Sequence, residues 1–178
     1  IKKSLLKYKP KMIFHTAGLS RPMIKHEKNI SRSIDLNILG TANLVKVCAS
    51  LDIKIIYFST CYVYDGIKGN FKETDKLAPY NFYGFTKMKG EKLVKILDEY
   101  MILRTRFFDK NKISFKYSAR NIYTSALEVN KLVKYIHILI KKKFKGTINV
   151  GGPKISDYKK YKKFKKDLKS CDKSKIFN

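Results

Sequence analysis

Apolar residues follow two different spacings along the chain, and the two alternate. Between residues 27 and 51 they recur every three or four positions, which predicts a long helix. Residues 53–59 form a β-branched and aromatic run without a helical period, as in a strand buried on both faces. The same reasoning predicts helices at residues 1–8, 83–100 and 125–142 and strands at residues 11–15, 101–106 and 146–150. Strands that alternate with helices are typical of an α/β fold around a parallel sheet.

The remaining segments carry weaker periodicity. Residues 64–82 are rich in Gly, Pro and Asn and predict a loop, and residues 110–124 are predicted to be irregular. Residues 141–178 stand apart because they contain 14 lysines and only three acidic residues. The apolar side chains near the end recur at helical spacing and predict a C-terminal helix with an aromatic inner face: Tyr158, Tyr161, Phe164 and Leu168.

The charge of the chain is strongly positive, with 40 Lys and Arg residues against 14 Asp and Glu residues and a net charge of +26. Such a charge suits a nucleic acid or an anionic membrane. Only five of the 40 basic residues are arginine, the side chain that base reading favours, and the lysines are spread over the whole chain. We therefore interpret most of the excess as solvated lysines. A basic nucleic-acid-binding protein, with the C-terminal helix as its contact, remains an alternative.

Composition narrows the class of protein further. A hydrophobic fraction of 44% supplies enough material for a folded core, which argues against a disordered chain. No uninterrupted apolar run approaches the roughly 18 residues of a membrane span, so no membrane partner is expected. The three cysteines form no CxxC pair and the three histidines lie far apart, so neither a disulfide framework nor a metal site is predicted. A reducing cytoplasm is the expected location.

One pair of side chains suggests chemistry. Tyr83 and Lys87 are four residues apart at the start of a predicted helix, which places them on the same face. A neighbouring ammonium favours the phenolate and lowers the pKa of a tyrosine, so that the phenol can exchange a proton near neutral pH. Thr60 ends the preceding strand, and its hydroxyl can bond the same substrate oxygen. An ordinary surface Tyr/Lys pair is the alternative.

Several ordered motifs resemble the extended short-chain dehydrogenase/reductases, and among them the dTDP-4-dehydrorhamnose reductase branch. The likeness spans about residues 11–152. It rests on HTAG at residues 15–18, NILGTANL at 37–44, STCYVYDG at 59–66, KETD at 72–75, YGFTKMKGEK at 83–92, LRT at 103–105 and NVGG at 149–152.

The resemblance implies a Rossmann-type doubly wound parallel sheet that is incomplete at its N-terminus and carries a small trimmed C-terminal substrate lobe. We expect a partial NAD(P)-binding domain over residues 1–150 and a lysine-rich helical segment over residues 151–178. The implied activity is NAD(P)-dependent reduction, or epimerisation, of a nucleotide-linked sugar. The expected cofactor is NAD or NADP, and the expected partner is a nucleotide-sugar substrate. Relatives commonly form homodimers through paired helices, so a homodimer is a possible state.

The resemblance also implies roles for individual residues. Tyr83 would be the catalytic acid/base, Lys87 would lower its pKa and hold the nicotinamide ribose, and Thr60 would orient the substrate oxygen. The remaining site residues are the small pair that would approach the cofactor and two aromatic residues that would line the sugar pocket: Ala17, Gly18, Tyr62 and Phe107. Core packing is the alternative for the two aromatic residues. Asn37 faces the site in many relatives.

Two departures from the family pattern affect these expectations. Cys61 stands where the rhamnose-type enzymes carry an acidic residue, which leaves the precise sugar open. The nine glycines contain no G-x-G-x-x-G or G-x-x-G-x-x-G turn for a pyrophosphate. In the family this turn precedes the HTAG strand, so we expect it upstream of Ile1. A non-catalytic sugar-nucleotide-binding or regulatory member of the fold is the alternative, although the retained Thr60, Tyr83 and Lys87 argue against it.

Overall fold

The computed structural model describes residues 1–177 and divides into two compact units. The first unit contains residues 1–104 and 144–149, and the second contains the other described residues, 105–143 and 150–177. These bounds differ from the expected division at residue 150. The chain leaves the first unit after Arg104 and returns to it for one strand, so the units are not continuous in sequence. Contacts between residues far apart in the sequence define the two units, so local sequence patterns do not predict their bounds.

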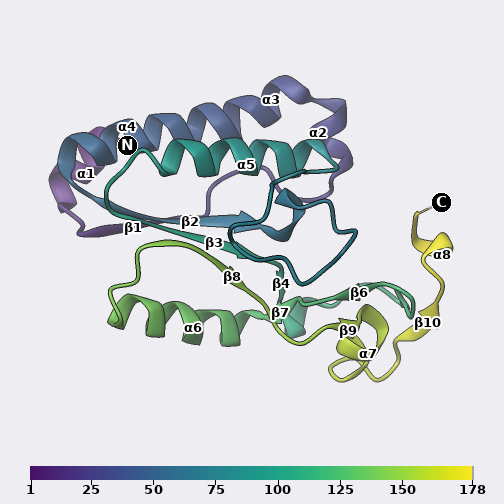
Figure 1. Cartoon of the computed structure of the whole chain (residues 1–178). Helices are drawn as coiled ribbons and strands as arrows, with labels where there is room; N and C mark the ends of the chain where they lie inside the picture. Colours follow the sequence, from purple (N-terminus) through teal and green to yellow (C-terminus); the bar gives the residue numbers. More distant parts are fainter. Residues whose placement is uncertain (178) are drawn as a thin grey trace. The chain divides into compact units, whose positions relative to one another are not determined.

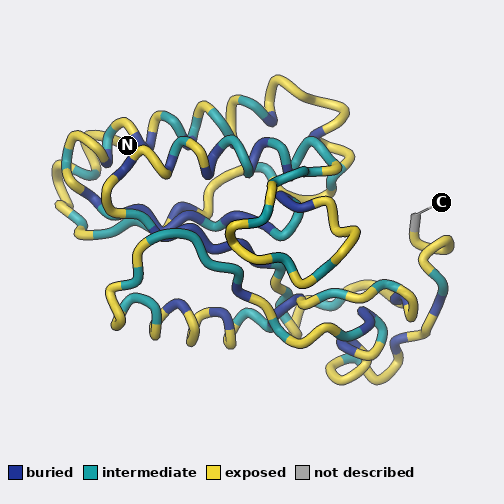
Figure 2. Tube along the Cα trace, in the orientation of Figure 1, coloured by how far each residue is buried: buried dark blue, intermediate teal, exposed yellow. Residues whose placement is uncertain are grey.

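The first unit is built on a four-stranded parallel sheet with the order β1-β2-β3-β8 (Figure 1). The strands are β1 (Met12–His15), β2 (Lys54–Thr60), β3 (Tyr100–Thr105) and β8 (Gly146–Val150). β1 pairs with β2 in a register that places Met12 opposite Lys54. Residues of β2 are almost entirely buried, as predicted for residues 53–59, and so are those of β3 (Figure 2).

Helices lie together on one face of this sheet (Figure 1). They are α1 (Lys2–Tyr8), α2 (Ile24–Lys28), α3 (Ile30–Ile34), the π-helical turn η1 (Asp35–Leu39), α4 (Gly40–Leu51) and α5 (Phe82–Val94). α4 and α5 pack against β2 and against each other. Their contact forms the core of the unit, which includes Leu44, Val45, Cys48, Ile55, Tyr57, Val94 and Ile102.

The helix predicted over residues 27–51 is interrupted. Asn29 separates α2 from α3, and its side chain caps α3 by accepting a hydrogen bond from the Arg32 N–H at 2.9 Å. From Ile30 to Leu51 the helical run is continuous, but η1 inserts a π turn into it. α5 also ends earlier than predicted, at Val94 instead of residue 100. The spacing of apolar residues does not predict the break at Asn29 or the early end of α5. It carries no information about capping side chains or about a local change of helical pitch.

The run from Ile30 to Leu51 is long and apolar enough to cross a membrane by length and composition, although no such stretch was expected. Core helices of globular proteins meet the same criterion. Its inward face is polar in part, because Ser33, Asn37 and Thr41 are buried and hydrogen-bonded within the first unit. We therefore interpret it as a core helix of that unit.

The second unit contains short paired strands and two main helices. β4 (Phe107–Phe108) pairs with β7 (Leu127–Glu128), β5 (Tyr117–Ala119) with β10 (Lys169–Cys171), and β6 (Tyr123–Thr124) with β9 (Ile155–Ser156). The helices are α6 (Val129–Lys141) and α7 (Asp157–Lys162), followed near the end by the single turn α8 (Ser174–Phe177). The turn η3 (Lys110–Lys112) lies between β4 and β5. Short strands thus occur where residues 110–124 were predicted to be irregular.

The prediction of one C-terminal helix is wrong. α7 covers only Asp157–Lys162, and the chain then turns and forms β10. Tyr161 is buried as expected and packs edge-on against Phe108, with ring centroids 5.0 Å apart. Leu168 is also buried, but it directly precedes a strand. Pairing with β5, which lies about 50 residues earlier, overrides the local helical spacing.

Candidate active site

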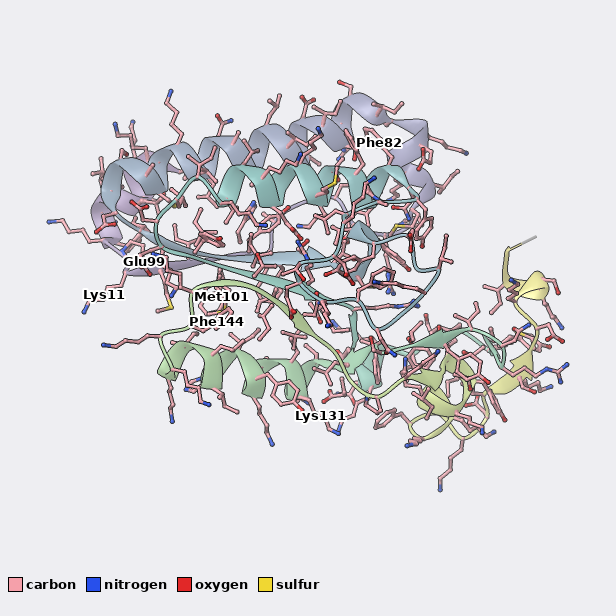
Figure 3. All side chains as sticks on the ribbon, in the orientation of Figure 1. Lys11, Phe82, Glu99, Met101, Lys131 and Phe144 are labelled. Carbon is pink, nitrogen blue, oxygen red and sulfur yellow. The ribbon has the colours of Figure 1, made fainter. Side chains whose placement is uncertain are left out.

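Thr60 and Tyr83 are brought together by a strand end and a helix start. Thr60 is the last residue of β2, and the short turn η2 (Cys61–Val63) follows it. Asn81 begins α5, because its side-chain oxygen accepts a hydrogen bond from the Gly84 N–H at 2.7 Å. Phe82, labelled in Figure 3, marks this end of α5, whereas Lys11 and Glu99 lie at the opposite end of the unit. The pair therefore lies at the carboxyl end of β2, where ligands bind in parallel sheets.

The phenol of Tyr83 lies among other polar and aromatic groups. The side chain of Thr60 lies near its hydroxyl, and its ring lies 5.0 Å from the ring of His26 and 6.1 Å from that of Tyr62. Burial raises the pKa of Tyr83 above its ordinary value, and the nearby Thr60 side chain and the charge of Arg21 only partly oppose the effect. The phenol is therefore protonated at neutral pH and can donate a proton.

Lys87 follows one turn later on α5 and is 8% exposed. Burial lowers the pKa of Lys87 to about 7, with the charge of Glu91 acting in the opposite direction. This differs from the expectation that Lys87 would lower the pKa of Tyr83, because the pKa of Tyr83 is raised. The physical reason is that burial disfavours the charged form of both groups, the phenolate and the ammonium alike.

The turn after β1 is open and small. Thr16, Ala17 and Gly18 are exposed, and Gly18 has a φ of 149°, in a region that side chains rarely adopt. A Cβ atom at Gly18 would lie 2.8 Å from Oδ1 of Asn37, so only glycine fits this position without a shift. Backbone at this turn is thus exposed, and the contact of Ala17 and Gly18 with a cofactor stays a prediction.

Asn37 connects that turn to α5. Its Oδ1 accepts a hydrogen bond from the Leu19 N–H at 2.7 Å, and its Nδ2 donates to the Leu19 carbonyl at 3.0 Å and to Thr86 Oγ1 at 3.0 Å. Thr86 directly precedes Lys87 on α5. Asn37 lies in the π turn η1, a local geometry that is frequent at functional sites. A polar residue in an apolar helix was the only sequence signal for this contact.

A buried ion pair fixes α5 against the sheet. Arg104 of β3 and Glu91 of α5 are 3% and 1% exposed, and Arg104 Nη2 lies 2.7 Å from Glu91 Oε2. Arg104 Nε donates a second hydrogen bond to the same carboxylate, and the Ser59 hydroxyl donates to its Oε1 at 2.5 Å. The carboxylate of Glu91 is therefore neutralised by the guanidinium of Arg104 and hydrogen-bonded at both oxygen atoms. The sequence motif contained both residues, but their pairing was not predicted.

Arg104 also holds the loop that surrounds the site. Its Nη1 donates to the Tyr64 hydroxyl at 2.7 Å and to the Glu73 carbonyl at 3.0 Å. The Tyr64 hydroxyl donates to Asn149 Oδ1 at 2.9 Å, and Asn149 Nδ2 donates to the Phe71 carbonyl at 2.8 Å. The loop after Tyr64 is thus tied to β3 and β8 by buried and partly buried hydrogen bonds. Residues 64–81 carry no helix or strand, as predicted, and α5 begins at Phe82.

The predicted site residues are placed unequally. Thr60, Tyr62 and Tyr83 lie together, and Lys87 follows Tyr83 on the same helix. Phe107 belongs to the second unit, where it is 43% exposed and pairs with Leu127. Its role in a sugar pocket stays a prediction. Among residues 1–177, no three His, Cys, Asp or Glu side chains are grouped so that they could hold a metal ion.

The turn after β1 and the side chain of Lys87 are the groups of this site that could contact a nicotinamide cofactor. The turn at Ala17 and Gly18 offers exposed backbone, and Lys87 offers an ammonium for which residues 1–177 provide no hydrogen-bond acceptor. These groups fit the nicotinamide and ribose end of a dinucleotide. The printed sequence holds no glycine motif for the pyrophosphate. The residues of this site therefore fit the nicotinamide half of the cofactor.

Comparison with known proteins gives a consistent family. The sequence model of the RmlD substrate binding domain matches residues 1–131. Among curated proteins, the dTDP-4-dehydrorhamnose reductase of Aggregatibacter actinomycetemcomitans is 34% identical over 100 residues, which are 55% of this chain and 34% of that protein. The methionine adenosyltransferase 2 subunit beta of Pongo abelii is 38% identical over 87 residues, 49% of this chain and 26% of that protein. The matches span about a third or less of these relatives.

The fold is shared with solved structures. The dTDP-4-dehydrorhamnose reductase of Bacillus anthracis, in complex with NADP, superposes with a TM-score of 0.86 at 22% identity. The match covers 99% of this chain and 70% of that structure. The expected Rossmann-type α/β fold is thereby confirmed.

Proposed function

The chain belongs to the RmlD substrate binding domain family, and from this premise we propose that it acts in the NAD(P)-dependent reduction of a keto group on a nucleotide-linked sugar. The observation that carries the proposal is the placement of Tyr83, in the first turn of α5, beside Thr60 at the carboxyl end of β2. A proton donor beside a second hydroxyl is what a carbonyl oxygen needs when it becomes an alcohol.

The residues of this chain divide the work as follows. Thr60 and Tyr83 both direct a hydroxyl to the place of the substrate oxygen. Tyr83 transfers its proton to that oxygen as negative charge develops on it. The resulting phenolate lies one helical turn from Lys87, whose ammonium stabilises it. The raised pKa of Tyr83 favours the protonated phenol before the reaction, which suits reduction.

The cofactor has a defined place in this proposal. Lys87 would hold its ribose hydroxyls, and the backbone of Ala17 and Gly18 would lie against it. When bound, the nicotinamide supplies the hydride. Support comes from the Bacillus anthracis structure, which is in complex with NADP. Support for a nucleotide sugar comes from the reductases among the relatives, and these favour reduction over epimerisation.

The variant Tyr83→Phe tests the proposal in the intact protein. We expect turnover of NADPH with a dTDP-4-keto sugar to fall by about 10²- to 10⁴-fold, the usual contribution of a positioned acid. The affinity for NADPH, measured by fluorescence titration, should change by less than about twofold because the phenol proton is spent only in the chemical step.

Tyr8→Phe is the matched control, since Tyr8 is 72% exposed on α1. It should leave both turnover and cofactor affinity unchanged. If Tyr83→Phe retains the turnover of the wild-type protein, Tyr83 is not the proton donor and the proposed mechanism is wrong.

A second candidate is a regulatory subunit. It is favoured by the identity of 38% over 87 residues with methionine adenosyltransferase 2 subunit beta, a protein named as a subunit. In that role the chain would bind a methionine adenosyltransferase and would need no proton from Tyr83. Co-purification with such an enzyme, unaffected by Tyr83→Phe and without NADPH turnover, would favour the regulatory role over reduction.

A further inference from the structure

The ammonium of Lys87 has an aromatic partner instead of an oxygen. Its Nζ lies 4.0 Å from the centroid of the Tyr57 ring, and the residue is 8% exposed. Within residues 1–177, no hydrogen-bond acceptor is recorded for this nitrogen. A cation over the face of an aromatic ring is attracted by the ring quadrupole, and the attraction is stronger where water is excluded. The ring face of Tyr57 is therefore one compensation that the ammonium receives, and the charge of Glu91 is another.

The Tyr57 ring is held so that it cannot turn away. It is fully buried on β2, and its hydroxyl lies 3.5 Å from the Lys87 carbonyl. A Cβ atom at Gly90 would lie only 2.1 Å from the Tyr57 hydroxyl oxygen, so the glycine on α5 makes room for the ring. The His15 ring lies 5.4 Å from it on the side of β1. The ring is thus a rigid surface beneath the side chain of Lys87.

The groups around Lys87 affect whether its side chain is protonated near neutral pH. Burial lowers the pKa of Lys87 to about 7, and Glu91 on the same helix opposes that change. His15 on β1 adds no competing positive charge near neutral pH, because burial and the charge of Lys87 lower its pKa to about 4. The hydroxyl of Tyr57 stays protonated, since burial raises its pKa. The ring face of Tyr57 therefore adds to the attraction of Glu91 in holding the ammonium.

We propose that the face of the Tyr57 ring is the resting seat of the Lys87 ammonium, which makes Tyr57 a positioning residue of the site. The ring holds the protonated side chain against β2 until the oxygen atoms of a bound ligand replace it. The inference rests on the proposed function only for the role of Lys87. Tyr57 itself touches neither substrate nor cofactor.

The test compares two variants of the intact protein without any ligand. Tyr57→Phe keeps the ring face, and Tyr57→Met keeps an apolar side chain without a ring. The pH dependence of Lys87 acetylation by acetic anhydride is followed by peptide mass spectrometry. Lys92, exposed on the same helix, is the internal reference.

We expect Tyr57→Phe to leave the labelling midpoint of Lys87 unchanged. Tyr57→Met should move the midpoint to lower pH, with about fivefold more labelling at pH 6, because a buried ammonium loses its cation–π partner. A midpoint that stays in place, or that rises, in Tyr57→Met overturns the proposal. A parallel shift at Lys92 does so as well, because it shows that the whole helix has changed.

A measurement on the wild-type protein covers the case in which Tyr57→Met does not fold. Protons above an aromatic ring face resonate upfield, so the Cε protons of Lys87 should be shifted upfield from those of the other lysines. Lys87→Arg assigns the signal. An unshifted signal overturns the proposal. Neither readout involves turnover. If the protein oxidises no NADPH but shows both the labelling shift and the upfield signal of Lys87, this inference stands and the proposed function is wrong.

Discussion

At the scale of single residues, burial changes the chemistry of groups that the sequence presents as ordinary. His15 and Lys87 are both buried, and the pKa of each is lowered, to about 4 and about 7 respectively. Tyr83 shows the opposite direction because its charged form is the anion. The Tyr83–Lys87 pair was found from its spacing in the sequence, but the direction of each pKa shift was decided by the surrounding residues.

His15 leads to a prediction about acid stability. The Thr41 hydroxyl donates to the Asn37 carbonyl, so His15 Nε2 donates its N–H to Thr41 Oγ1 at 2.9 Å and the imidazole is neutral. In the unfolded chain the imidazole binds a proton below about pH 6.5, whereas the folded one does so only below about 4. The free energy of unfolding should therefore fall as the pH is lowered from 6.5 to 4, by about 2–3 kcal/mol from this group.

Urea denaturation at several pH values measures this contribution. His15→Asn should remove it and flatten the curve between pH 6.5 and 4. His137→Asn on α6 is the control and should leave the slope as in the wild-type protein. An equal slope in His15→Asn and in the wild-type protein would show that other groups cause the acid sensitivity.

At the scale of elements, close approach between backbones places the site. Gly84 lies in the first turn of α5, next to Tyr83, and a Cβ atom there would lie 2.1 Å from the Tyr62 carbonyl oxygen. The absence of a side chain thus lets α5 contact η2, the turn that follows Thr60. The capping oxygen of Asn81 and the Glu27 carboxylate, which accepts the Phe82 N–H at 3.2 Å, hold the same helix start.

Gly84→Ala should therefore weaken both the fold and the site. We expect a loss of about 1–3 kcal/mol in the free energy of unfolding, because the new methyl group meets backbone that cannot move aside. Gly152→Ala is the control, since a Cβ atom there meets its nearest neighbour at 3.5 Å, an ordinary contact. Thermal unfolding of the two variants, followed by circular dichroism, compares them. Equal melting temperatures would contradict the close approach.

At the scale of the whole molecule, the main feature is the net charge of +26, which comes mostly from lysines. Not every lysine is solvated: Lys87 lies over Tyr57, and Lys160 is 5% exposed and bonded to Thr124 and Asp157. The other lysines are not confined to one helix, because the C-terminal segment is a short helix followed by a strand. A cytoplasmic location and a homodimer stay predictions.

This distribution predicts weak, non-specific binding of nucleic acid. The affinity for duplex DNA, measured by fluorescence anisotropy, should fall by about 10³-fold or more between 0.05 and 0.2 M salt and be negligible near 0.15 M. Heparin, a polyanion without bases, should show the same salt dependence as the control. Tight DNA binding at 0.15 M salt would instead support the nucleic-acid alternative.

The sequence by itself determined the α/β class, the order of the main strands and helices, and the place of Thr60, Tyr83 and Lys87 along them. These features follow from local apolar spacing and from short motifs. Only the tertiary structure decided the strand at Lys169–Cys171, the two-unit division, the pairing of Glu91 with Arg104, and the contact of Lys87 with Tyr57. Each of these depends on burial or on pairing between residues far apart in the chain, and no local pattern records such energies.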